Sequence, residues 1–187
     1  MKRMVLPLVL SIIYLVAPGC RKAPEQGQAT PTPTPAAGGV DINRMTPEQK
    51  AEARRAIVAW LECEECTEGQ LEAVVKLGAA AVPSLAASLR EGPSPANREV
   101  LRRNLIANYR ELKEYERSHP EARVAMTEEE YLRTYMENYV ALHQTRAAKA
   151  LGAIGGPEAR RALEEATRGQ LREDVMSAVR ASLDKMR

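Results

Sequence analysis

The chain of 187 residues contains no phenylalanine, a single tryptophan and two histidines, and aromatic residues make up only 4% of it. Alanine and leucine provide most of its apolar content, which favours helices over strands. No Ser-His-Asp constellation and no Gly-rich phosphate loop is present. A zinc site needs about four ligands, and the few Cys and His residues form no cluster of that kind. We therefore predict no catalytic residues, no metal and no cofactor.

The chain also lacks a strong charge of either sign. It has 27 basic and 25 acidic residues, and two of the basic ones, Lys2 and Arg3, belong to a segment that we expect to be removed. The remainder is balanced. Such a balance gives no electrostatic reason to expect binding to nucleic acid or to an anionic membrane surface.

The long apolar run of the sequence lies at its N-terminus. Lys2 and Arg3 precede an apolar stretch from Val5 to Val16, which has the length of a signal-peptide core and is shorter than the roughly 20 residues needed to span a bilayer. The sequence LVAPGC that ends at Cys20 resembles the lipobox of bacterial lipoproteins, although Ala17 stands where that family prefers leucine. The resemblance predicts a signal peptide over residues 1–19 and lipidation of Cys20. An ordinary secreted protein with a free terminal thiol is the alternative.

Residues 20–45 have the composition of a tether. The stretch ATPTPTPAAGG alternates proline with threonine and shows no apolar periodicity, so we expect an extended, disordered linker between membrane and domain. Arg21, rather than aspartate, follows Cys20. In the lipoproteins that the lipobox resembles, this pattern implies sorting to the outer membrane, facing the periplasm.

Residues 46–187 are predicted to form one all-α domain. Thr46, Thr67 and Thr127 are each followed three residues later by Gln or Glu, the signature of a capping box at a helix start. Apolar residues recur at three- and four-residue steps, and we place Trp60 in the core. We expect about seven helices, over residues 47–62, 67–77, 81–90, 95–117, 128–153, 157–167 and from 171 onward.

Cys63 and Cys66 lie between the first two expected helices. An exported protein meets an oxidising compartment, and adjacent turns bring such residues within the Cα separation that a disulfide tolerates. A structural disulfide is therefore the leading interpretation. Thiol redox chemistry would need electropositive surroundings, whereas Glu64 and Glu65 separate the cysteines; redox use, metal binding and free thiols remain alternatives.

Two stretches of the chain resemble each other. The sequences LEAVVKLGAAAVPSLAASL (residues 71–89) and TRAAKALGAIGGPEARRALEEAT (residues 145–167) each show a helix ending in Leu-Gly, a short turn and a second helix rich in small residues. They resemble HEAT-like repeats of the phycobilisome-lyase type, with Gly156 in place of the family's aspartate. The resemblance implies a short α-α superhelix of stacked hairpins and, in most of the family, a binding scaffold. A minority of the family attaches bilins.

Tyr131, Tyr135 and Tyr139 recur at four-residue steps on the longest expected helix. Tyrosine is enriched at interfaces, so these three are candidate partner-binding residues; alternatively, they fill the gap against the helix at 95–117. His143 lies on the same stripe, and we expect it to be packed rather than catalytic.

The leading hypothesis is a non-enzymatic, outer-membrane-tethered helical scaffold that binds a protein partner in the periplasm. A thiol-redox protein using Cys63 and Cys66 is the second hypothesis. A small-ligand or bilin-handling enzyme, with an enclosed pocket lined by Tyr139 and His143, is the third.

Overall fold

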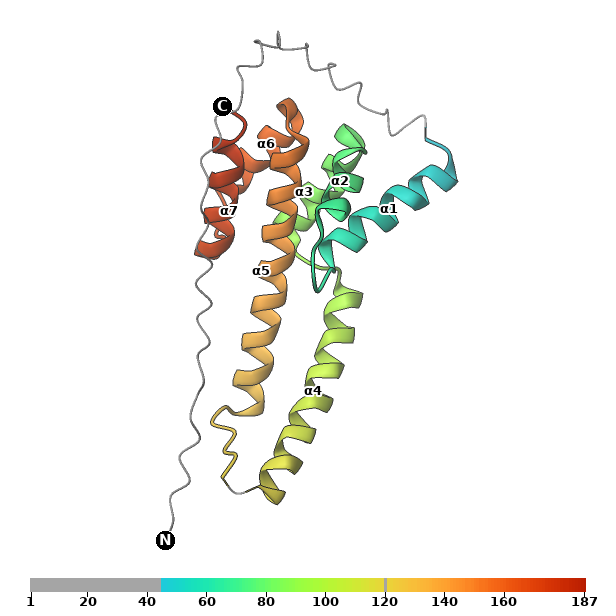
Figure 1. Cartoon of the computed structure of the whole chain (residues 1–187). Helices are drawn as coiled ribbons and strands as arrows, with labels where there is room; N and C mark the ends of the chain where they lie inside the picture. Colours follow the sequence, from blue (N-terminus) through green and yellow to red (C-terminus); the bar gives the residue numbers. More distant parts are fainter. Residues whose placement is uncertain (1–44, 120) are drawn as a thin grey trace, which may run out of the picture. The chain divides into compact units, whose positions relative to one another are not determined.

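The structure is a computed structural model that describes residues 45–119 and 121–187. The signal peptide, Cys20 and the linker expected from the sequence lie outside these residues, apart from Met45. The described part is all-helical, which confirms the predicted fold class (Figure 1). Its elements are α1 (Pro47–Leu61), α2 (Glu68–Val75), the short 3-10 helix η2 (Gly78–Ala81), α3 (Val82–Glu91), α4 (Pro95–Ser118), α5 (Glu128–Ile154), α6 (Gly156–Ala166) and α7 (Glu173–Asp184).

The helix starts agree with the capping signals in the sequence. Thr46, Thr67 and Thr127 each accept a hydrogen bond from the backbone N–H three residues later, and the Gln or Glu at that position accepts one in return. Helix α6 begins without any side-chain cap, after Gly155 with φ of 70°. Gly155 and Gly156 both have a positive φ, 70° and 81°, which favours glycine, so α6 starts from a glycine turn in place of a side-chain cap.

Two helix boundaries differ from the sequence prediction by more than one residue. Helix α2 ends at Val75 rather than about residue 77, because the chain tightens into the 3-10 turn η2, which leads directly into α3. Helix α7 begins at Glu173 rather than at Leu171. Leu171 instead precedes the helix and packs against the main core.

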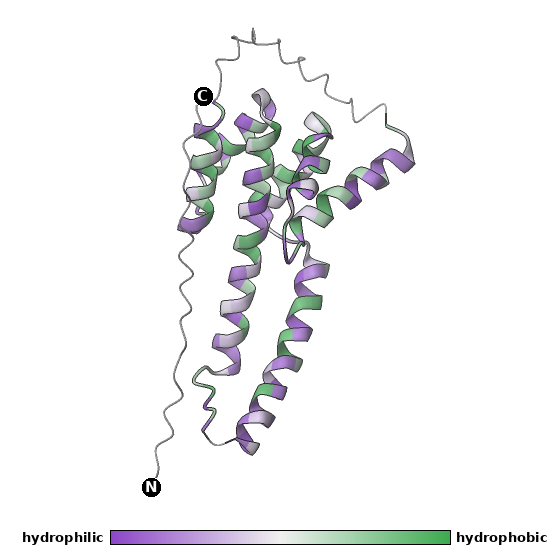
Figure 2. Ribbon diagram, viewed as in Figure 1, coloured by the Kyte–Doolittle hydropathy of each residue, from purple (hydrophilic) through white to green (hydrophobic). Residues whose placement is uncertain are grey.

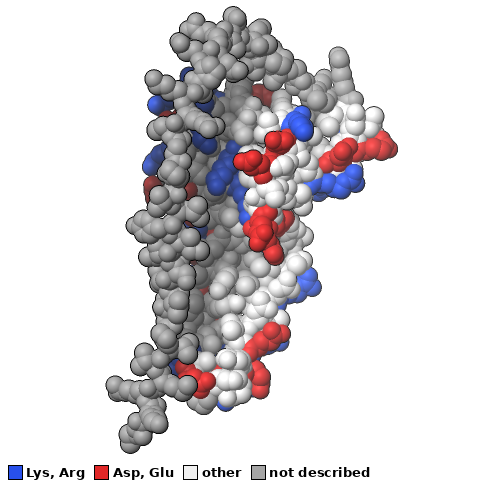
Figure 3. All heavy atoms as spheres, in the orientation of Figure 1, with Lys and Arg blue, Asp and Glu red and all other residues white. Residues whose placement is uncertain are grey.

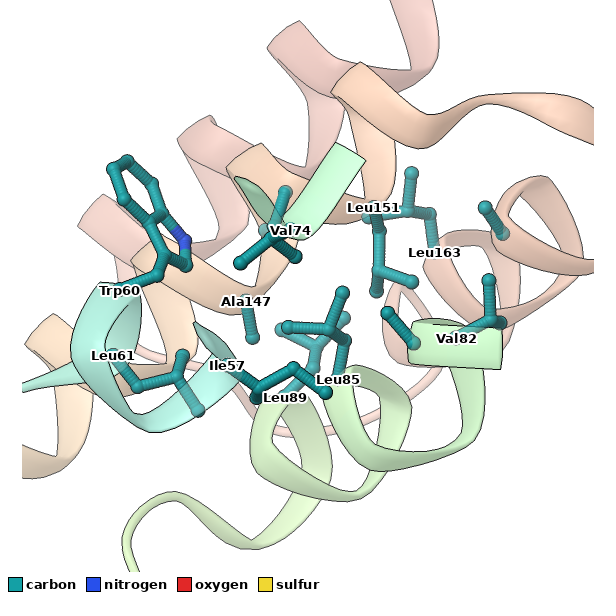
Figure 4. Close-up of a cluster of buried hydrophobic side chains, with 14 of the residues drawn as sticks. Ile57, Trp60, Leu61, Val74, Val82, Leu85, Leu89, Ala147, Leu151 and Leu163 are labelled. Atoms are coloured by element: carbon teal, nitrogen blue, oxygen red, sulfur yellow. The ribbon is translucent and has the colours of Figure 1, made fainter. Parts of the chain in front are cut away.

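The C-terminal half of α5 lies at the centre of the domain. It packs against α1, α2, α3, α6 and α7, while α3 also packs against α6. Figure 4 shows the side chains that meet in this core: Ile57, Trp60, Leu61, Val74, Val82, Leu85, Leu89, Ala147, Leu151 and Leu163. Burial of Trp60 confirms its predicted core position.

Small residues on α5 allow neighbouring helices to approach closely. Ala147, Ala148 and Ala150 have no exposed surface, and a Cβ atom added to Gly152 would stand 2.6 Å from Cβ of Ser182 on α7. Helices pack on several sides of α5, so its buried set is wider than the single stripe read from the sequence. It also contains Ala141, Gln144, Arg146 and Ala148.

Helix α4 packs mainly against the first half of α5, and the two lie side by side in Figure 1. We call residues 95–139 the α4–α5 hairpin. It has a small core of its own, formed by Leu105, Tyr109 and Tyr131. Hydrophobic and hydrophilic residues alternate along both of its helices (Figure 2). The hairpin is therefore stabilised largely by contacts within itself.

The surface carries charges of both signs. On the face shown in Figure 3, acidic and basic side chains are interspersed among uncharged ones. Among the helices that the structure describes, none is by itself both long and apolar enough to cross a membrane; only α2 together with residues 78–91, bent by 101°, meets that test as a pair.

A polar cluster at the junction of α1, α4 and α5

The disulfide predicted between Cys63 and Cys66 is present, with the two Cα atoms 5.2 Å apart. It closes the turn between α1 and α2. Cys63 is buried, whereas Cys66 is exposed. The residue before the disulfide, Glu62, is the C-cap of α1 and turns its side chain towards α4 and α5. The disulfide thus restrains the backbone next to this carboxylate.

Glu62 accepts hydrogen bonds from two other elements. The hydroxyl of Tyr139 on α5 lies 2.9 and 2.8 Å from its two carboxylate oxygens, and Nδ2 of Asn97 on α4 donates to Oε1 at 2.7 Å. Burial would raise the pKa of Glu62, but these bonds and His143 outweigh it and hold the pKa below its ordinary value of 4.5. Glu62 is therefore a carboxylate at neutral pH.

His143 lies one turn after Tyr139 on α5, and its ring packs edge-on against the Tyr139 ring with centroids 4.8 Å apart. Its Nε2 lies 3.1 Å from Oε1 of Glu62. Neither ring nitrogen makes a hydrogen bond of acceptable geometry, although the residue is only 3% exposed. Burial lowers the pKa of His143 despite the neighbouring carboxylate, so the ring is neutral at pH 7. An unpaired buried polar group of this kind costs about 1–3 kcal/mol.

Arg146 is buried next to this cluster. Its guanidinium donates to the carbonyl of Leu61 at 2.8 Å, while its own carbonyl accepts the indole N–H of Trp60 at 3.0 Å. The Arg146 side chain thus ties α5 to the C-terminal end of α1. Burial lowers the pKa of Arg146 below the ordinary value of an arginine, and the nearby Glu62 opposes that shift.

We call Glu62, Asn97, Tyr139 and His143 the Glu62 cluster. It borders two hollows on the surface. One, of about 440 Å³, is lined by Glu62, Asn97 and His143 together with residues of α1, α3 and the α3–α4 connection. The other, of about 330 Å³, is lined by Glu62, Asn97, Tyr139, Val100, Leu101 and Asn104. The first is within the size range of ligand sites, and polar and apolar residues both line it.

The three tyrosines singled out in the sequence lie in three different environments. Tyr131 is 9% exposed and its ring packs 5.4 Å from that of Tyr109, in the small hairpin core. Tyr135 is 47% exposed. Tyr139 is half-buried and bonded to Glu62, and its pKa is raised by burial and by that bond. Of the two hollows beside the Glu62 cluster, His143 lines the first and Tyr139 the second.

Sequence reasoning missed Glu62, Asn97 and Arg146. The helix pattern predicts Glu62 only as the last residue of the expected helix 47–62 and Asn97 only as a residue of the expected helix 95–117. One signal was available, because Tyr139, His143 and Arg146 recur at four- and three-residue steps on the face of α5 that otherwise carries apolar residues. Polar groups at such steps indicate a shared buried partner.

The arrangement is suited to binding. It combines the ionised carboxylate of Glu62, the neutral imidazole of His143, whose nitrogens make no hydrogen bond of acceptable geometry, and the adjacent 440 Å³ hollow. Within residues 45–119 and 121–187, no group of three or more His, Cys, Asp or Glu side chains is placed to hold a metal ion. Comparison of the chain with protein-family models, with curated proteins and with solved structures found no match.

Proposed function

We propose that this protein is a lipoprotein anchored in the outer membrane through Cys20, and that its helical domain is a non-enzymatic scaffold binding a protein partner in the periplasm. The lipobox-like sequence before Cys20 and the Pro/Thr-rich linker support the anchored part of the proposal. The resemblance of residues 71–89 and 145–167 to HEAT-like repeats supports the scaffold part, since most such repeats are binding scaffolds.

The observation that carries partner binding is the surface of the α4–α5 hairpin. Of seven large hydrophobic side chains exposed in the described chain, five belong to this hairpin: Val100, Leu112, Tyr115, Met126 and Tyr135. Two of them are tyrosines, about half exposed, and tyrosine is among the residues that contribute most at interfaces. Because the hairpin packs mainly on itself, these side chains remain available to a partner.

Site-specific photo-crosslinking tests this proposal. A photoreactive amino acid is placed at Tyr115 or Tyr135 in the full chain, and at Glu165 on α6 as an exposed control outside the hairpin. We expect one discrete protein adduct from each hairpin position and none from Glu165. Equal labelling at all three positions, or no adduct at either tyrosine, would contradict partner binding by the hairpin.

The anchor is tested separately. Mass analysis of the N-terminal peptide should show an acylated Cys20, and Cys20→Ala should move the protein from the membrane to the soluble fraction. An N-terminal cysteine without acyl mass would refute the tether and leave the scaffold proposal standing.

A further inference from the structure

A groove runs along one side of α1. The 440 Å³ hollow beside the Glu62 cluster continues into a second hollow of about 540 Å³, with Arg54, Ile57 and Ser84 shared by both. We call the two together the α1–α3 groove. Helices α1 and α3 each pack against α5 but make little contact with one another. The groove therefore lies between two helices whose backbones make few close contacts with each other, and it ends at Glu62 and His143.

We propose that the α1–α3 groove receives a lysine or arginine side chain of a partner polypeptide, with its cationic head at the carboxylate of Glu62. This inference rests on the proposed function, because it specifies a chemical feature of the protein partner. It concerns a different surface from the exposed face of the α4–α5 hairpin, so each can be tested alone.

The hydrogen-bonding state of the cluster indicates a ligand that donates hydrogen bonds. The donors already bonded to Glu62, Tyr139 and Asn97, are neutral, and among the described residues no Lys or Arg nitrogen lies within 4.0 Å of this carboxylate. His143 lines the same groove and is neutral, but both of its ring nitrogens are buried, so Glu62 is the acceptor that a ligand in the groove would meet. An ammonium or guanidinium group supplies several donors and the charge that Glu62 lacks.

Three arginines near the cluster do not fill this role. Arg146 and Arg98 are bonded to backbone carbonyls, Arg146 to that of Leu61 and Arg98 to that of Pro93, and neither lines the 440 Å³ hollow. Arg54 does line it, but it precedes Glu62 by eight residues on α1, which is about 12 Å along the helix axis. Arg54 is thus placed to meet an acidic residue flanking the cation rather than to pair with Glu62.

The groove also suits the stem of a long basic side chain. Ile57, Leu61 and Ala87 line the same hollow as the carboxylate. Lysine and arginine place their methylene groups on apolar surface while the charged head reaches a polar group. A carboxylate next to apolar residues therefore selects a basic side chain over a small, fully hydrated cation.

The test uses a pair of blocked tripeptides, acetyl-Leu-Arg-Leu-amide and its citrulline twin, which has the same shape without the charge. Titrated into the full chain and followed by NMR of the His143 ring, the arginine peptide should saturate with a dissociation constant on the order of 10 mM or tighter. The citrulline peptide should bind at least about fivefold more weakly, and added salt should weaken the binding of the arginine peptide.

Two variants make the result decisive. Glu62→Gln retains an acceptor for Tyr139 but removes the charge, and it should abolish the preference for arginine over citrulline. Ala87→Leu fills the groove from α3 without changing a residue of the Glu62 cluster, and it should weaken the binding of both peptides. No saturation by the arginine peptide, or equal binding of the two peptides, overturns the proposal. If free n-butylguanidinium bound and the arginine peptide did not, the ligand would not be part of a polypeptide, and the proposal would be overturned. None of these outcomes depends on crosslinking at the hairpin.

Discussion

Nε2 of His143 lies 3.1 Å from Oε1 of Glu62, yet neither nitrogen of this buried ring makes a hydrogen bond of acceptable geometry. The pair brings the end of α1 against the middle of α5, between residues far apart in the chain. It joins a carboxylate that stays ionised to an imidazole that burial keeps neutral. Acidification should therefore act on this contact first through His143.

We predict that the free energy of unfolding falls as the pH drops below about 6.5. Burial lowers the pKa of His143 in the folded state, whereas in the unfolded chain the ring titrates near its ordinary value of 6.5. The unfolded state therefore binds more protons in this window, and stability decreases with falling pH, by at most about 1.4 kcal/mol per pH unit for one group. Glu62 adds to the loss only below its ordinary value of 4.5.

Urea unfolding between pH 7.5 and pH 5.5 measures this slope. His143→Gln should flatten it, while Tyr135→Phe on the same helix should retain it. The charges of Arg146 and Arg98 lower the pKa of His143 further, and that of Glu62 raises it. The pH dependence of the free energy of unfolding therefore reports the net effect of these three charges together with burial. A slope that His143→Gln leaves unchanged would assign the pH dependence to other groups.

Tyr139→Phe should reduce the free energy of unfolding by about 1 kcal/mol, because it removes the hydroxyl that donates to Glu62. Tyr135→Phe is the matched control, since that side chain is exposed, and should change stability by less than about 0.5 kcal/mol. In a double-mutant cycle, Tyr139→Phe and Glu62→Ala should be non-additive by about 0.5–1.5 kcal/mol. Additive effects would mean that the two side chains do not interact in solution.

Alanine substitutions at Tyr131 and Tyr135 should distinguish a contribution to stability from a contribution to partner binding. Tyr131→Ala should cost about 3 kcal/mol, because its ring packs on Tyr109 in the small core of the hairpin. Tyr135→Ala removes a ring whose centroid lies 4.5 Å from that of Tyr131, so it should cost only about 0.5–1.5 kcal/mol, and it should reduce the crosslinked adduct formed from Tyr115. Denaturation and crosslinking of the same two variants check this. A stable Tyr135→Ala variant with an undiminished adduct would remove Tyr135 from the interface.

Gly152→Ala should destabilise the domain by about 1–3 kcal/mol. Its new Cβ would lie 2.6 Å from Cβ and 3.1 Å from Cα of Ser182, so α5 and α7 must move apart. Gly69→Ala in α2 is the control, because nothing lies within 4 Å of its added Cβ and alanine is the better helix former. Thermal or urea unfolding of both variants gives the comparison. Equal stability of both would show that the helices are not packed this closely.

Replacing Cys63 and Cys66 together by alanine should cost about 2 kcal/mol, the value expected for so short a loop. Reducing the native protein should have a similar effect. Equilibration with glutathione then tests the redox alternative: we expect the disulfide to persist at a strongly reducing poise. Ready exchange through the exposed Cys66 would favour a redox role over a structural one.

Local signals in the sequence were enough for the helices of this domain. Capping boxes at Thr46, Thr67 and Thr127 set helix starts whichever partners the helices find, because the bonds involved span three residues. The Cys63–Cys66 disulfide is equally local. The periodicity of α5 showed one apolar stripe, but it could not show that other helices would cover further sides and bury Ala141, Gln144 and Arg146.

The sequence by itself therefore determined the helical class, most helix boundaries, the disulfide and the small-residue character of α5. Only the tertiary structure decided which polar groups meet. Glu62 lies next to Asn97, Tyr139 and His143 because α1, α4 and α5 converge there, and no short-range pattern encodes that convergence. It also decided the separate environments of Tyr131, Tyr135 and Tyr139, since identical spacing on one helix says nothing of what packs opposite each turn.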